Sequence, residues 1–119
     1  MKRYYVIGSN SSNSLSPLIF NHWFKKYNIK AVYSFIEVGK PNFDKTLINI
    51  IQNKISRGLN ITTPYKKNII KHLHSISRHA ENIGAVNCVT IGKKTKGINT
   101  DWIGYLNTIK KKKIKKNKN

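Results

Sequence analysis

Apolar segments along the chain alternate between short runs and longer stretches with helical spacing. Short apolar runs at residues 4–7, 31–37 and 58–62 predict buried strands. Between them, apolar residues recur every three or four positions, which is typical of amphipathic helices. This alternation predicts an α/β fold with a mostly parallel sheet flanked by helices.

The first predicted helix begins where a serine precedes a proline. Ser16 is positioned to cap the helix, and Pro17 suits the first turn because its missing amide hydrogen would have no partner there. We interpret the apolar side chains of this helix as part of the core rather than as a platform on which bases stack. They are Leu18, Phe20, Trp23 and Phe24.

Two further helices are predicted in the middle of the chain. One has Phe43 and Leu47 on its apolar face, together with Ile50 and Ile51. The other repeats the boundary of the first helix, because Thr63 and Pro64 end a strand and open a helical pattern. The apolar residues of that pattern are Ile69, Ile70 and Leu73.

The second half of the chain predicts a short helix and a hairpin. A helix over 77–82 stops at Gly84, which suits the left-handed position after a helix end. Strands at 85–91 and 96–99 are joined by a turn, as in a hairpin.

Length and composition predict one domain over residues 1–109 and a disordered tail over 110–119. A chain of 119 residues has room for one core, and the tail carries seven lysines that repel one another. Cys88 is the only cysteine, and apolar runs fall short of the roughly 18–20 residues that a membrane helix needs. We therefore expect a reducing, cytoplasmic setting and no membrane association.

The formal charge of +19 raises the alternative of a lysine-rich nucleic-acid binder. However, 20 of the 23 basic residues are Lys and only 3 are Arg, the residue that best recognises phosphates and base edges. Lys accompanies abundant Ile and Asn, and all three have A- and T-rich codons. Biased base composition explains the charge better than a nucleic-acid partner does.

Polar side chains gather where the predicted strands end. In an open parallel sheet the ligand crevice lies outside the carboxyl ends of the strands, so these side chains are expected to converge. Hydroxyls, amides and a lysine near helix N-termini would suit a small, hydroxyl-rich anion. The residues are Ser14, Ser16, Asn60, Thr62, Lys66, Asn87, Asn99 and Asp101.

Lys66 and Asp101 are the candidate acid–base pair, since a lysine and a carboxylate can hold a substrate hydroxyl between them. Asp101 is one of only four acidic residues in the chain. On spacing alone, the simpler interpretation is that Asp101 caps a helix beginning at Trp102 and that Lys66 is a surface lysine.

Three histidines, His72, His74 and His79, raise the question of a metal. No Cys or carboxylate cluster accompanies them in the sequence, so we predict that they are solvated and that no metal binds.

Four motifs in order resemble the N-terminal domain of shikimate dehydrogenases. They are S-L-S-P at 14–17, N-I-T-T-P-Y-K at 60–66, G-A-V-N at 84–87 and N-T-D at 99–101. The resemblance implies a substrate domain that binds shikimate or 3-dehydroshikimate. It also implies an NADP-dependent oxidoreductase of the shikimate pathway, which supplies chorismate for aromatic amino-acid biosynthesis.

By this resemblance the site residues divide into three roles. Lys66 and Asp101 would be the catalytic pair that moves the proton as hydride travels to or from the nicotinamide. The carboxylate would be held by Ser14 and Ser16, and the ring hydroxyls would be contacted by Asn60, Thr62, Asn87 and Asp101.

The sequence also departs from the family pattern. Trp102 replaces the Gly that usually follows the catalytic Asp, and no G-x-G-x-x-G phosphate loop is present. We therefore expect no cofactor-binding residues in this chain and no hydride transfer by the chain alone. A separately encoded cofactor domain, or one restored by a change of frame in the lysine codons, would complete the enzyme. The alternatives are a non-catalytic remnant and a domain that only binds a small acid such as quinate or shikimate.

Overall fold

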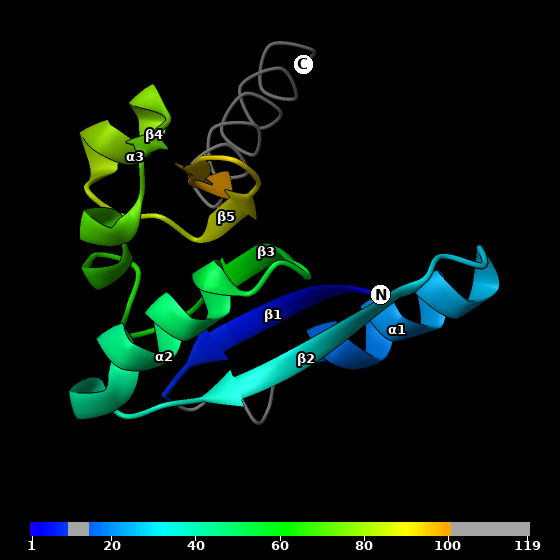
Figure 1. The fold of residues 1–119 in the computed structure, drawn as a ribbon. Helices are drawn as coiled ribbons and strands as arrows, with labels where there is room; N and C mark the ends of the chain where they lie inside the picture. The colour runs from blue at the N-terminus through cyan, green and yellow to red at the C-terminus, as the bar shows by residue number, and fades with distance from the viewer. Residues whose placement is uncertain (10–14, 101–119) are drawn as a thin grey trace, which may run out of the picture.

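Six strands form one sheet in the computed structural model, which describes residues 1–9 and 15–100 (Figure 1). The strands are β1 (Lys2–Gly8), β2 (Ala31–Glu37), β3 (Ser56–Ile61), β4 (Ser75–Ile76), β5 (Cys88–Ile91) and β6 (Thr95–Ile98). The helices are α1 (Ser16–Lys26), α2 (Lys40–Gln52), the 3-10 helix η2 (Asn68–His72) and α3 (Arg78–Ile83). The helix considered to begin at Trp102 and the predicted tail at 110–119 lie outside the described residues.

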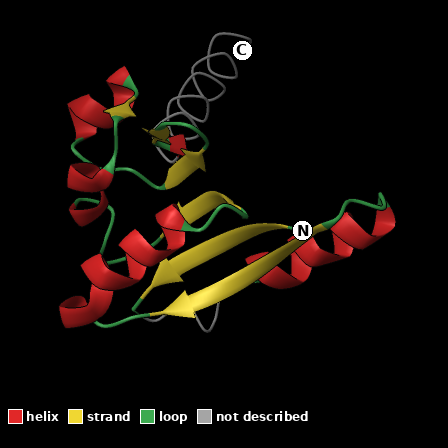
Figure 2. Ribbon diagram, in the orientation of Figure 1, coloured by secondary structure: helices red, strands yellow, loops and turns green. Residues whose placement is uncertain are grey.

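The sheet is mixed, with the order β2-β1-β3-β5-β6-β4. Pairs β1–β2, β1–β3 and β4–β6 are parallel, whereas β3–β5 and β5–β6 are antiparallel. Strands β1, β2 and β3 lie side by side with helices beyond them (Figure 2). The predicted α/β class, with a mostly parallel sheet flanked by helices, is confirmed.

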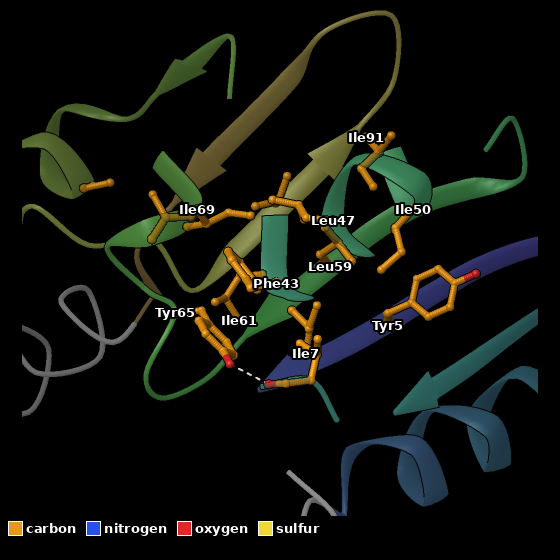
Figure 3. Close-up of a cluster of buried hydrophobic side chains, with 14 residues drawn as sticks. Tyr5, Ile7, Phe43, Leu47, Ile50, Leu59, Ile61, Tyr65, Ile69 and Ile91 are labelled. Carbon is orange, nitrogen blue, oxygen red and sulfur yellow. Dashed lines mark hydrogen bonds between the residues drawn. The ribbon is translucent and has the colours of Figure 1, made fainter. Parts of the chain in front are cut away.

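The core lies between α2 and one face of the sheet. Alternate strand residues point to the same face, so Tyr5 and Ile7 of β1 share a side with Leu59 of β3. Against them pack the apolar residues of α2 that the spacing predicted (Figure 3). Phe43, Leu47 and Ile50 are buried there, and Ile51 is partly buried.

Helix α1 lies on the opposite face, and the prediction that its aromatic residues are core is wrong. Phe20 and Trp23 are 42% and 50% exposed, and no residue of α1 is buried. The helix packs on β2 and β1, where Phe20 stacks on Tyr33 and Phe24 meets Tyr4. The spacing identified correctly which side of this helix is apolar. That side extends beyond β1 and β2, which the helix covers, so its residues stay partly exposed.

The predicted capping role of Ser16 is also wrong. The residue before the helix is Leu15, whose backbone is already helical, and no side-chain cap is formed. Ser16 is instead the first helical residue, and its side chain shares a hydrogen bond with Tyr33.

The helix predicted to open at Thr63–Pro64 does not form there. The Thr63–Pro64 peptide bond is cis, and the chain makes turns before η2 begins at Asn68. Lys66 therefore precedes a short 3-10 helix and does not lie in the first turn of an α-helix. Helix starts were predicted at Ser16–Pro17 and at Thr63–Pro64, and only the first, the start of α1, is found.

The second half follows the predictions closely. Ser77 caps α3 by accepting a hydrogen bond from the amide of Ala80 at 3.2 Å, and Gly84 ends the helix with a φ of 75°. Strands β5 and β6 form the predicted hairpin. However, β5 begins at Cys88, so Asn87 precedes the strand, and the two-residue strand β4 was not predicted.

Replacing Gly97 by alanine is expected to lower the free energy of unfolding by about 1–3 kcal/mol. A Cβ at this position would lie 2.6 Å from Cδ1 of Leu73 and 2.9 Å from Cγ1 of Val86. Gly92→Ala in the hairpin turn is the matched control, because its Cβ would come no closer than 4.0 Å to a neighbour. Urea denaturation measures both, and an equal loss in the two variants would contradict this packing argument.

The prediction that the three histidines are solvated is only partly correct. His72 is 15% exposed, and its Nε2 lies 2.8 Å from a carboxylate oxygen of Asp44, whose other oxygen accepts from Lys71 at 3.3 Å. Within residues 1–9 and 15–100 no group of three or more potential ligands could hold a metal ion. Helices long and apolar enough to cross a membrane are likewise absent from the described residues.

Acidification should weaken the fold partly through Asp44. The hydrogen bond from His72, and then that from Lys71, lowers the pKa of Asp44 below its ordinary value of 3.8. A lowered carboxyl pKa contributes stability that is present above the ordinary value and lost as pH falls through the lowered one. Between about pH 5 and pH 3 the wild type should lose slightly more melting temperature than Asp44→Asn. Equal losses of melting temperature in the wild type and in Asp44→Asn would contradict the pairing of Asp44 with His72 and Lys71.

Candidate functional site

Three predicted site residues lie beside the segment that leads into β5, and a fourth, Asn87, belongs to that segment. Asn60 pairs in register with Cys88, and the amide of Ile61 donates to the carbonyl of Asn87 at 2.8 Å. The carbonyl of Lys66 accepts from the amide of Val86, also at 2.8 Å. Asn60 and Lys66 therefore contact residues 86–88 through their backbones, and Thr62 follows Ile61, which contacts Asn87.

Thr62 lies where β3 ends, beside the end of β1. Its amide donates to the carbonyl of Ile7 at 3.0 Å, and its carbonyl accepts from Tyr65 at 3.1 Å. These contacts place Thr62 at the carboxyl edge of two parallel strands, where the crevice was predicted.

Asn87 fixes the segment that follows β6. Its Oδ1 accepts from the amide of Thr100 at 2.9 Å, and its Nδ2 donates to the Thr100 hydroxyl at 2.8 Å. Asn99, which is 4% exposed, donates from Nδ2 to the carbonyl of Ala85 at 3.1 Å. The chain that leads to residue 101 is thereby held against residues 85–87.

Lys66 belongs to a loop that is anchored in the core. Tyr65 is 1% exposed, stacks on Phe43 with ring centroids 4.1 Å apart, and donates its hydroxyl hydrogen bond to the carbonyl of Val38 (Figure 3). Burial raises the pKa of Tyr65, so its hydroxyl remains a donor. The position of the Lys66 backbone is therefore set by the residue before it.

Ser16 and Asn60 are brought together by a residue that sequence reasoning missed. The Tyr33 hydroxyl accepts a hydrogen bond from Nδ2 of Asn60 and shares another with the Ser16 side chain. A buried tyrosine usually has a hydrogen-bond partner for its hydroxyl. This rule was the one available signal that Tyr33 could take part in the site, but the sequence does not identify the partner. Ser14, Asp101 and Trp102 lie outside the described residues, so their roles and the Lys66–Asp101 pair stay predictions.

A cavity of about 370 Å³ lies on the α1 face of the sheet, and most of these polar residues do not line it. Aromatic rings from α1, β1 and β2 form much of its wall, and Asn60 alone of the described site residues lines it. Burial raises the pKa of the Cys88 thiol at its side. The walls include Tyr4, Phe20, Phe24, Tyr33, Asn60 and Cys88.

The architecture defines an α/β domain with polar residues at the edge where its parallel strands β1 and β3 end. Residues 6–89 match the model of the shikimate dehydrogenase substrate binding domain, and the chain belongs to that family. The NADP(+) shikimate dehydrogenase of Sulfolobus acidocaldarius is 39% identical over 97% of this chain, and that of Clostridium beijerinckii is 42% identical over 88%.

Solved structures agree with this assignment. Shikimate dehydrogenase from Aquifex aeolicus superposes with a TM-score of 0.83 at 36% identity, covering 93% of this chain and 42% of its own. The Thermus thermophilus enzyme, solved in complex with shikimate, has a TM-score of 0.82 at 30% identity, covering 92% of this chain and 42% of its own. The chain spans 42% and 39% of the length of the two curated relatives.

The relatives carry NADP(+) in their names, but the described junction between β2 and α2 does not fit its pyrophosphate. Such a group binds at a Gly-rich turn between a strand and a helix. Between β2 and α2 the described chain has Gly39 alone, and G-x-G-x-x-G is absent from the sequence.

Proposed function

We propose that this chain binds shikimate or 3-dehydroshikimate, as the substrate-binding domain of an NADP-dependent shikimate dehydrogenase. The observation that supports the proposal is that Asn60 and Lys66 contact residues 86–88, the segment that contains Asn87, while Thr62 follows Ile61, which contacts Asn87. Amide, hydroxyl and ammonium groups together match a ligand with several ring hydroxyls.

The roles proposed for the residues follow the chemistry of their groups. Asn60, Thr62 and Asn87 contact ring hydroxyls, and Ser16 with Ser14 binds the carboxylate. Lys66 with Asp101 moves the proton on the substrate oxygen that becomes, or ceases to be, a hydroxyl. In the whole enzyme, the cofactor is held by residues outside those described, on this polypeptide or on a second one, and the setting is cytoplasmic.

Calorimetric titration of the chain with shikimate tests the proposal. We expect saturable binding at or below millimolar concentration. Cyclohexanecarboxylate, which keeps the carboxylate and lacks the hydroxyls, should bind at least about tenfold more weakly, because the polar site groups would lose their partners. No heat with shikimate at millimolar concentration, or equal affinity for both acids, would contradict the proposal.

A further inference from the structure

Tyr33 lies in the edge strand, on the same face of the sheet as Asn60. In the parallel register Tyr33 pairs with Tyr4, and Tyr4 pairs in turn with Gly58 of β3. Asn60 is two residues beyond Gly58, so its side chain projects from the same face as that of Tyr33. The face is that of α1, which carries Ser16 at its start.

The backbone of Tyr33 is hydrogen-bonded to the side chain of an asparagine of α1. Because β2 is the edge strand, the backbone groups on its outer side have no strand to pair with in the described sheet. At Tyr33, the side chain of Asn21 makes the backbone hydrogen bonds that a neighbouring strand would make. Its Nδ2 donates to the Tyr33 carbonyl and its Oδ1 accepts from the Tyr33 amide, both at 2.8 Å.

The ring of Tyr33 is also fixed through its face. It stacks on Phe20 with ring centroids 4.7 Å apart and planes 9° from parallel, and Tyr33 is 4% exposed. Burial raises the pKa of the Tyr33 hydroxyl, and its hydrogen bonds with Asn60 and Ser16 only partly oppose this. The hydroxyl is therefore neutral at physiological pH and can accept one hydrogen bond while donating another.

We propose that Tyr33 is a positioning residue of the substrate site, whose hydroxyl fixes the Asn60 amide relative to the Ser16 hydroxyl. The two side chains come from β3 and α1, and Tyr33 joins them through a third element, β2. This inference rests on the proposed function, in which Ser16 binds the carboxylate and Asn60 binds a ring hydroxyl. Tyr33 acts through them, without touching the substrate itself.

Tyr33→Phe tests the inference, because it keeps the ring against Phe20 and removes only the hydroxyl. The dissociation constant for shikimate should rise about tenfold. Tyr4→Phe is the matched control, since Tyr4 lies in the same row on the neighbouring strand, and it should change the constant less than about twofold. Unfolding midpoints of both variants verify that the fold is kept.

A double-mutant cycle separates positioning from a merely structural effect. In an Asn60→Ala background, Tyr33→Phe should change the dissociation constant by less than about threefold, because the side chain to be positioned is gone. An undiminished tenfold loss in that background, or unchanged binding by Tyr33→Phe in the wild-type background, would overturn the inference. The second result leaves the proposed function standing.

A readout without ligand keeps the two proposals distinguishable. The side-chain amide protons of Asn60, followed by NMR, should exchange slowly in the wild type and in Tyr4→Phe, and faster in Tyr33→Phe. If the wild type binds no shikimate, the proposed function fails, while this exchange still decides whether Tyr33 holds Asn60. Fast exchange in the wild type, or exchange unaffected by Tyr33→Phe, would overturn the positioning role.

Discussion

Phe43→Ala is expected to remove about 3–5 kcal/mol from the free energy of unfolding. Phe43 is 2% exposed and lies at the centre of the contact between α2 and the loop after β3. Its ring stacks on Tyr65 and meets the edge of His72, with ring centroids 6.4 Å apart in the second case. Alanine would leave a cavity between buried groups that are each fixed by other contacts, so little of it can close.

Such a loss is large for a domain of this size, whose total stability is typically about 5–15 kcal/mol. Urea denaturation followed by circular dichroism measures it. Trp23→Ala on α1 is the control, because Trp23 is 50% exposed and its truncation should cost less than about 1 kcal/mol. Similar losses for the two variants would show that the core does not lie on the α2 side of the sheet.

Lys66→Met is expected to weaken shikimate binding about ten- to a hundredfold, with little effect on stability. Hydrogen bonds to charged groups contribute about 1.5–3 kcal/mol, and methionine removes the ammonium while keeping an unbranched side chain. The contact of Lys66 with Val86 uses the backbone carbonyl, so the substitution leaves it in place.

Lys67→Met is the matched control for Lys66→Met. Lys67 is the next residue, is exposed, and carries the same charge, so both variants lower the net charge by one. Calorimetry with shikimate should find near wild-type affinity for Lys67→Met. Equal affinity of the two variants would assign Lys66 to the solvated surface and contradict its place in the site.

The fold could be predicted well where a single element carries its own signal. The apolar runs of β1 and β2 and the spacing of Phe43, Leu47 and Ile50 required no tertiary information. Ser77 and Gly84 marked the ends of α3 because capping is local chemistry.

The predictions were wrong where the local structure depends on tertiary contacts. The aromatic side of α1 showed that a helix forms, but its exposure depends on which strands the helix covers. Thr63–Pro64 has the composition of a helix start, and composition does not distinguish a cis from a trans peptide bond before proline.

The candidate site was predictable as a set of residue types at strand ends, but its connections were not. Asn60, Thr62, Lys66 and Asn87 were proposed as candidates because polar side chains near the ends of the predicted strands were expected to meet at one edge. The bridge through Tyr33 and its support by Asn21 depend on sheet register and on the edge position of β2. These are properties of the assembled sheet, so no local pattern reveals them.

NMR titration of the isotope-labelled chain with shikimate tests the central claim most directly. The account predicts that saturating shifts concentrate at Asn60, Thr62, Lys66 and Asn87, at the edge where β1 and β3 end, while Phe24 and Thr90 beside the aromatic cavity stay unchanged. Shifts confined to cavity-wall residues other than Asn60, such as Phe24 and Thr90, or none at millimolar shikimate, would contradict it.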